Sequence, residues 1–173
     1  MDMLKAKLQF KEKDIHAIAA RYQYQAGEKK LASLKPFVRQ RGFITKDELH
    51  EIAYWKAPRI AVHVEKNSKK YVSEVTRFAL STPEERARIE VLTCLNSVSW
   101  PTASVMLHFF HVDPYPILDF RALESIGVEV PSQYTFDFWW QYVKFCRAVA
   151  RKNRVRMRTL DKALWQFSKE KQV

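Results

Sequence analysis

Asp119 is the carboxylate of this sequence that is best placed for chemistry. It follows a stretch interrupted by Pro114 and Pro116 and stands immediately before a helical pattern that begins at Phe120. A carboxylate at a helix N-terminus, next to a strongly apolar helix, lies where the helix dipole and burial can tune its ionisation. The structural alternative is an N-cap, because Asp is among the residues preferred at that position.

A second candidate is the short turn before the most apolar helical pattern of the chain. Residues 96–101 are rich in turn formers and include Ser97, Ser99 and Trp100. We expect Thr102 to cap a helix over residues 103–112, whose two apolar stripes predict a central core helix. The N–H groups of a helix start can bind phosphate oxygens. Trp100 suits either contact with a nucleic acid or packing inside the protein.

Together these segments resemble the helix-hairpin-helix DNA glycosylases, which include endonuclease III, adenine glycosylases and alkyladenine glycosylases. Their pattern is L-P-G-V-G-x-x-T-A, a core helix, and an apolar run that ends in a catalytic aspartate at the start of the next helix. The hairpin positions match at Leu95, Val98, Thr102 and Ala103, and residues 115–119 resemble the aspartate segment.

Two departures from this pattern matter for the chemistry. Ser97 and Ser99 replace the two hairpin glycines, and Pro101 stands where bifunctional members carry a Schiff-base lysine. The resemblance therefore implies a monofunctional enzyme, which excises a base without cleaving the strand through a Schiff base. It also implies that Asp119 stabilises an oxocarbenium ion or activates water. Some members of the family carry an iron–sulfur loop that needs four cysteines; this sequence has two, so we expect no cofactor.

The fold expected from the sequence is all-α. Three glycines in 173 residues are few for a sheet protein, and long helical periodicities run through the chain. The resemblance implies about ten helices in one compact domain, residues 1–173, with two lobes flanking a cleft. We expect a hairpin lobe at about 67–127 and a second lobe from 1–66 and 128–173. Further helix starts are expected at a Thr45 capping box and at Thr82-Pro83.

The net charge of +11 fits a polyanionic partner, although a merely solubilising surface explains it equally well. On the helical pattern over 136–152, Lys144, Arg147 and Arg151 form a basic stripe that could follow a phosphate backbone. An ordinary solvated helix face is the alternative. Arg121 could pair with Asp119 or contact a phosphate.

A glycosylase that flips its target base needs an aromatic pocket. The helix end at residues 54–59 carries Tyr54, Trp55, Lys56 and Arg59, which could wall such a pocket and hold a phosphate. A core tryptophan beside two solvated cations is the alternative. The other candidate pocket residues are Tyr115, Phe120 and Trp139.

The remaining features narrow the setting. We expect Cys94 and Cys146 to be reduced core thiols of a cytoplasmic protein, because neither a paired cysteine spacing nor a signal or membrane-spanning segment is visible. A glycosylase of this size would most simply act as a monomer. His108 and His111 have a metal-like spacing, but we interpret them as core or surface histidines and expect no metal.

Three hypotheses follow for the function. The first is a DNA glycosylase acting on duplex DNA with a flipped, damaged or modified base, including the modified bases of phage DNA in a defence role. The second is a non-catalytic helix-hairpin-helix DNA-binding protein. The third is a helical adaptor for an acidic protein. The sequence leaves open which base would be excised.

Overall fold

The computed structural model describes residues 4–23 and 27–171. These residues form ten α-helices and two short 3-10 helices and contain no strand, which confirms the all-α expectation. The chain divides into two compact units: unit 1 comprises Met1–Tyr24 and Pro114–Val173, and unit 2 comprises Gln25–Asp113. These limits differ from the lobes expected from the sequence, since residues 25–66 fall in the same unit as the hairpin and residues 114–127 fall in the other.

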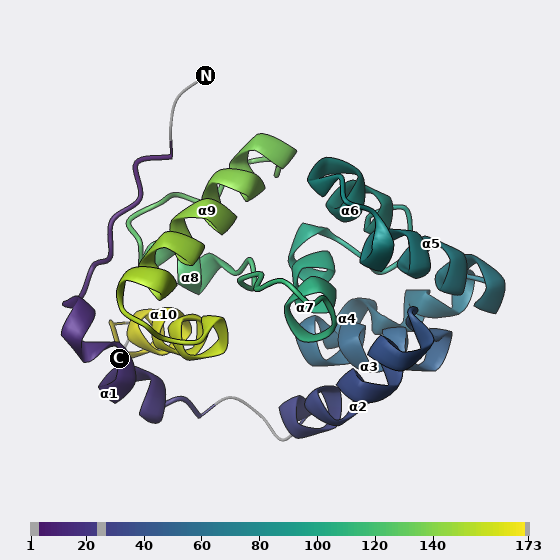
Figure 1. Ribbon diagram of the computed structural model, residues 1–173, viewed down its shortest axis with the longest axis horizontal. Coiled ribbons are helices and arrows are strands. Elements are labelled where there is room, and N and C mark those ends of the chain that lie inside the picture. Colours follow the sequence, from purple (N-terminus) through teal and green to yellow (C-terminus); the bar gives the residue numbers. More distant parts are fainter. Residues whose placement is uncertain (1–3, 24–26, 172–173) are drawn as a thin grey trace. The chain divides into compact units, whose positions relative to one another are not determined.

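Unit 2 is built around one apolar helix. Its helices are α2 (Gly27–Arg41), α3 (Lys46–Lys56), α4 (Pro58–Ala61), η2 (Val62–Lys66), α5 (Lys69–Ser81), α6 (Glu85–Leu92) and α7 (Trp100–Phe110). Helix α7 packs against α2, α3 and α6 (Figure 1). All its residues from 102 to 110 except His108 are buried, which confirms the expected core helix.

The helix starts of unit 2 follow local capping rules, though not always at the expected residue. The Thr45 capping box is present, with Glu48 as its second member. Helix α6 is capped by Glu84, whose carboxylate accepts from the Ala87 N–H at 2.5 Å. The expected Thr82 cap is wrong, because its hydroxyl accepts from the Glu84 N–H instead. Helix α7 begins at Trp100, so Thr102 lies inside the helix and the expected cap there is also wrong.

The buried side chain of Arg88 contacts His111, the C-cap residue of α7. The Arg88 guanidinium lies 2.5 Å from Nε2 of His111, which is itself buried, and also donates to the carbonyl of Ala79 at 3.1 Å. Arg39 donates to the carbonyl of His111 at 2.7 Å. His111 therefore has a packing environment within unit 2, in keeping with its interpretation as a core histidine.

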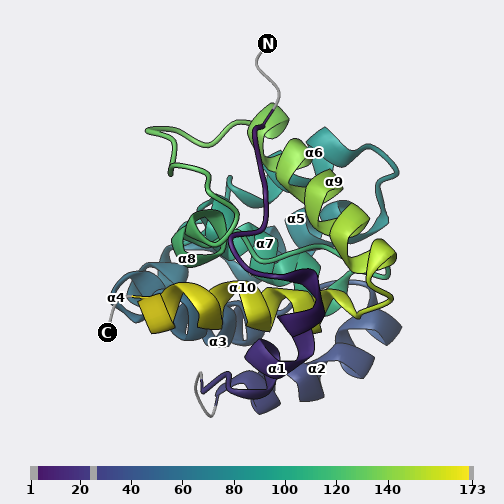
Figure 2. The same cartoon turned by 90° about the vertical axis from the view of Figure 1, so that its left-hand side faces the viewer.

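Unit 1 is organised on the last helix of the chain. It contains η1 (Glu12–Asp14), α1 (Ile15–Ala20), α8 (Phe120–Glu124), α9 (Phe136–Lys152) and α10 (Met157–Lys171). Helix α10 packs against α1, α8 and α9 (Figures 1 and 2). The extended segment before η1 lies against the end of α8, where the N–H of Gln9 donates to the carbonyl of Ser125 at 2.9 Å.

The two cysteines have different environments. Cys146 is buried in α9, and burial raises the pKa of its thiol. Cys94 is exposed in the turn after α6, so the expectation of a core thiol is wrong for this residue. None of the described helices has the length and apolar character needed to cross a membrane.

Candidate nucleic-acid interface and catalytic carboxylate

In the turn between α6 and α7, Ser97 adopts a backbone conformation that glycine usually supplies. Ser97 adopts a φ of 73°, in the left-handed region. A residue with a Cβ is disfavoured there by about 1–2 kcal/mol, a cost that glycine avoids. The chain therefore keeps, at Ser97, a conformation for which the family pattern uses glycine, and contacts elsewhere must hold it.

The Ser97 side chain supplies one such contact. Its hydroxyl donates to the carbonyl of Ile60 at 2.5 Å, between α4 and the turn. The single O–H of Ser97 is thus already used, so any phosphate contact from this residue would come from its backbone. The bond also places exposed Arg59, the neighbour of Ile60, beside the turn.

Asn67 supplies the second set of contacts. It is 2% exposed, and its amide nitrogen donates to the carbonyls of Val64 at 3.1 Å and Asn96 at 3.0 Å. Its side-chain oxygen accepts from the N–H of Asn96 at 3.0 Å. The N–H and the carbonyl of Asn96 therefore both form hydrogen bonds with the buried Asn67 side chain, and Asn96 directly precedes Ser97 with its positive φ.

The other residues expected to bind DNA from unit 2 have mixed settings. Ser99 is exposed, while Trp100 and Lys56 are half-buried. Thr102 is 1% exposed, and its hydroxyl finds no acceptor among the residues that the structure describes. We therefore omit Thr102 from the proposed phosphate contacts. The first turn of α7 keeps N–H groups that have no partner within the helix.

Asp119 begins α8 in unit 1. It is the N-cap residue, and its Oδ1 accepts from the N–H of Arg121 at 3.0 Å. The N-cap interpretation is confirmed, and the half-buried carboxylate also remains the best candidate for catalysis. Burial raises the pKa of the Tyr134 phenol, and the nearby charge of Asp119 raises it further.

Side chains hold the segment that leads to Asp119. Arg147 Nε donates to the carbonyl of Pro114 at 2.8 Å. The N–H of Ile117 donates to Oδ1 of Asp161 at 3.0 Å, and the hydroxyl of Tyr142 donates to the carbonyl of Ile117 at 2.9 Å. The segment belongs to no sheet, so these side chains supply the hydrogen bonds that a neighbouring strand would give to its backbone.

Most of the expected base-pocket residues lie in the cores of their units. Tyr115 and Trp139 are 0% exposed and stack on each other in unit 1, with ring centroids 5.7 Å apart. Trp55 is buried in unit 2, edge-on to Phe109 at 5.7 Å. Only two of the five expected aromatics are exposed: Tyr54 in unit 2, at 59%, and Phe120 in unit 1, at 51%. Each of these two remains, within its own unit, a candidate for contact with a base.

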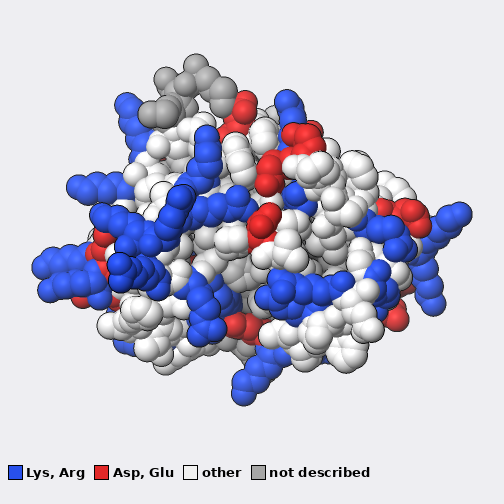
Figure 3. Space-filling view, viewed as in Figure 1, with Lys and Arg blue, Asp and Glu red and all other residues white. Residues whose placement is uncertain are grey.

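The basic stripe on α9 divides into two kinds of residue. Lys144 and Arg151 are exposed, and Figure 3 shows Lys and Arg side chains gathered over the α9 part of the surface. Arg147 instead lies 4.5 Å above the ring of Tyr115, in addition to its bond to Pro114. Arg121 lies over the rings of Phe120 and Trp165, at 5.0 Å and 5.4 Å.

We therefore expect Arg147→Ala and Arg151→Ala to differ in effect. Arg147→Ala should lower the free energy of unfolding by about 1–2 kcal/mol, because a hydrogen bond and a cation–π contact are lost. Arg151→Ala should change stability by less than about 0.5 kcal/mol but reduce the salt dependence of duplex affinity by about one phosphate contact. Urea unfolding and a salt titration of binding measure the two effects. Equal stability losses would contradict the division.

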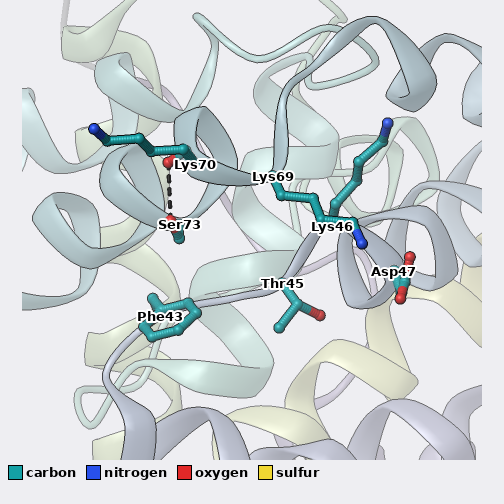
Figure 4. Close-up of a pocket in the computed structure, with 7 residues that line it drawn as sticks. All are labelled: Phe43, Thr45, Lys46, Asp47, Lys69, Lys70 and Ser73. Carbon is teal, nitrogen blue, oxygen red and sulfur yellow. Dashed lines mark hydrogen bonds between the residues drawn. The ribbon is translucent and has the colours of Figure 1, made fainter.

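Unit 2 also has an open hollow of about 410 Å³ between the starts of α3 and α5. Phe43, Thr45, Lys46 and Lys69 are among its lining residues. Lys46 is paired with Glu65 at 2.8 Å, and the amine of Lys70 points away from Lys46 and Lys69 (Figure 4). The cations do not converge on one point, so we assign no ligand to this hollow.

Sequence reasoning missed the residues that support the two segments. Asn67, Tyr142 and Asp161 belong to no motif of the sequence and have no spacing that predicts a functional role. Asn67 lies 29 residues from its partner Asn96. Tyr142 and Asp161 lie 25 and 44 residues from their shared partner Ile117. No local spacing in the sequence relates these residues.

Comparison with known proteins agrees with the architecture. No protein-family model matches the sequence, and no curated protein matches it significantly. A solved structure does match: the Methanocaldococcus jannaschii 8-oxoguanine glycosylase/lyase in complex with a 15mer DNA containing 8-oxoguanine. The TM-score is 0.51 at 14% identity, over 92% of this chain and 80% of that one. The chain has the fold of a helix-hairpin-helix DNA glycosylase. At this identity, the likeness concerns the fold alone.

Proposed function

We propose that the protein is a DNA glycosylase that hydrolyses the N-glycosidic bond of a damaged or modified base in duplex DNA. The observation that carries the proposal is the placement of Asp119 at the start of α8, after a segment whose backbone is held by side chains of α9 and α10. In the helix-hairpin-helix glycosylase pattern that this segment resembles, the aspartate at the position of Asp119 is the catalytic residue. The structural match to a glycosylase/lyase bound to DNA supports a glycosylase or a DNA-binding function at a coarse level.

Asp119 would act on the sugar of the flipped nucleotide. As the bond from C1′ to the base nitrogen breaks, its electron pair leaves with the base and positive charge develops on the sugar. The Asp119 carboxylate would stabilise that charge, or accept a proton from the water that adds to C1′. The water loses one proton, to Asp119 or to solvent, and the departing base nitrogen takes one up, so the products are the neutral free base and an abasic site.

Each unit carries candidate contacts to a phosphate backbone. Unit 2 offers Ser99, Trp100, Lys56 and Arg59 together with the first-turn N–H groups of α7. Unit 1 offers a second group of three basic residues: Arg121, Lys144 and Arg151. Affinity should therefore fall steeply with salt, as expected when several phosphates are neutralised.

The enzyme should not form a Schiff base at the family's lysine position, because Pro101 occupies it in the first turn of α7. We expect borohydride to trap no covalent complex with a duplex from which the protein releases a base. Denaturing electrophoresis of the mixture shows this directly, with a known bifunctional glycosylase as the positive control. A trapped complex would contradict the monofunctional proposal.

The base is best identified by its release. Wild-type protein should be incubated with duplexes that carry alkylated, oxidised or deaminated bases, and with phage DNAs that contain modified bases, and the free bases measured by mass spectrometry. Release of one base class supports the proposal, and release from phage DNA would favour a role in defence. If the protein binds these DNAs with a steep salt dependence but releases nothing, the non-catalytic DNA-binding alternative replaces it.

A further inference from the structure

We propose that Asp161 is a positioning residue that holds Asp119 in place for the reaction, an inference that rests on the proposed glycosylase function. Asp161 lies near the start of α10 and is only 5% exposed. A buried carboxylate is costly unless hydrogen bonds and a counter-charge compensate it. The mechanism above gives Asp161 no direct role, so its contacts must account for it.

These contacts run from the N-terminal segment to the backbone before Asp119. One carboxylate oxygen of Asp161 accepts from the N–H of Ile117 at 3.0 Å. The other oxygen pairs with Nη1 of Arg158. Arg158 in turn donates to the hydroxyl of Tyr22 at 3.2 Å and lies over the Tyr22 ring at 5.2 Å. Asp161 is thus itself held in one orientation.

The N–H and the carbonyl of Ile117 form hydrogen bonds with side chains of two different helices. Asp161 of α10 binds the N–H, and Tyr142 of α9 binds the carbonyl at 2.9 Å. Leu118, the next residue, is 0% exposed and cannot move without disturbing the core. Asp119 follows and caps α8. The path of the backbone into Asp119 therefore depends on these few side-chain contacts.

Loss of the Asp161 acceptor should affect the chemical step more than DNA binding. A displacement of about 1 Å in a reacting group can cost roughly a hundredfold in rate, whereas the proposed phosphate contacts do not include Asp161. A merely structural role predicts a different result, in which stability falls but the rate of the folded fraction does not.

The test compares two double variants, Asp161→Asn/Arg158→Ala and Asp161→Ala/Arg158→Ala. Both lack the ion pair, so neither leaves one charge buried alone, and they differ in the side-chain oxygen that can accept from Ile117. On a duplex from which wild type releases its base, the Ala variant should be at least about tenfold slower than the Asn variant in single-turnover release. Their duplex Kd values should agree within about twofold. Hydrogen exchange of the Ile117 amide should be faster in the Ala variant.

Three outcomes would overturn the inference. Equal release rates in the two variants would show that the acceptor does not position Asp119, while wild-type release would leave the proposed function standing. A change in Kd that accounts for the whole rate difference would indicate a binding effect instead. Failure of wild type to release any base would remove the proposed function and this role with it. Arg21→Ala, which breaks an exposed ion pair with Glu170 on α10, is the control and should leave the rate unchanged.

Discussion

Asp119→Asn should slow single-turnover base release by roughly a hundred- to a thousandfold, the range measured when one preorganised electrostatic contact to a transition state is removed. The substitution removes the negative charge that would face the developing sugar cation. Asparagine caps a helix about as well as aspartate, so α8 should remain intact and stability should change little. Duplex affinity should stay equal or increase slightly, since a negative charge near the DNA is lost.

Asp137→Asn is the matched control for this prediction. Asp137 is an exposed carboxylate in the first turn of α9, in the same unit, and its substitution makes the same change in net charge. It should release base at the wild-type rate. If Asp119→Asn is folded and equally active, Asp119 is only the N-cap of α8 and the proposed mechanism is wrong.

Asn67→Ala should be the most destabilising single substitution that we propose, lowering the free energy of unfolding by about 2–4 kcal/mol. It removes four hydrogen bonds, three to Asn96 and one to Val64, at a residue that is 2% exposed. Each is worth about 1 kcal/mol net, and a backbone group left buried and unpaired costs more. Urea unfolding with a unit 2 probe measures the loss.

The same substitution should weaken duplex binding by roughly tenfold, because a loosened turn must be ordered again when it binds. Asn153→Ala is the control: Asn153 donates to the carbonyl of Val149 in its own helix end in unit 1, at 2.9 Å. It should cost no more than about 1 kcal/mol and leave affinity unchanged. Full retention of duplex affinity in a folded Asn67→Ala protein would show that the hairpin turn is not a DNA-binding element.

The Ser97 turn illustrates how a sequence departure can be misleading. Replacement of the hairpin glycine by serine suggests a changed turn, yet Ser97 adopts a φ of 73°. The conformation depends on the carbonyl of Ile60, which lies in α4, and on Asn67, which lies between η2 and α5. Nothing in the local sequence of the turn shows that these partners are present.

A shared helix face likewise did not predict a shared role. Lys144, Arg147 and Arg151 share one face of α9, but only Arg147 meets the carbonyl of Pro114 and the ring of Tyr115. The difference arises because the segment before Asp119 passes over one turn of that face. Periodicity identifies the face, and the packing of distant segments selects the residue.

The sequence by itself determined the helices, the apolar core helix α7 and the N-cap position of Asp119, because these depend on local periodicity and on capping within a few residues. Only the tertiary structure decided that Trp55, Tyr115 and Trp139 lie in cores while Tyr54 and Phe120 are exposed. An aromatic side chain fits an apolar core and a base pocket equally well by composition. Its burial is settled by which elements pack around it, and those contacts join residues far apart in the chain.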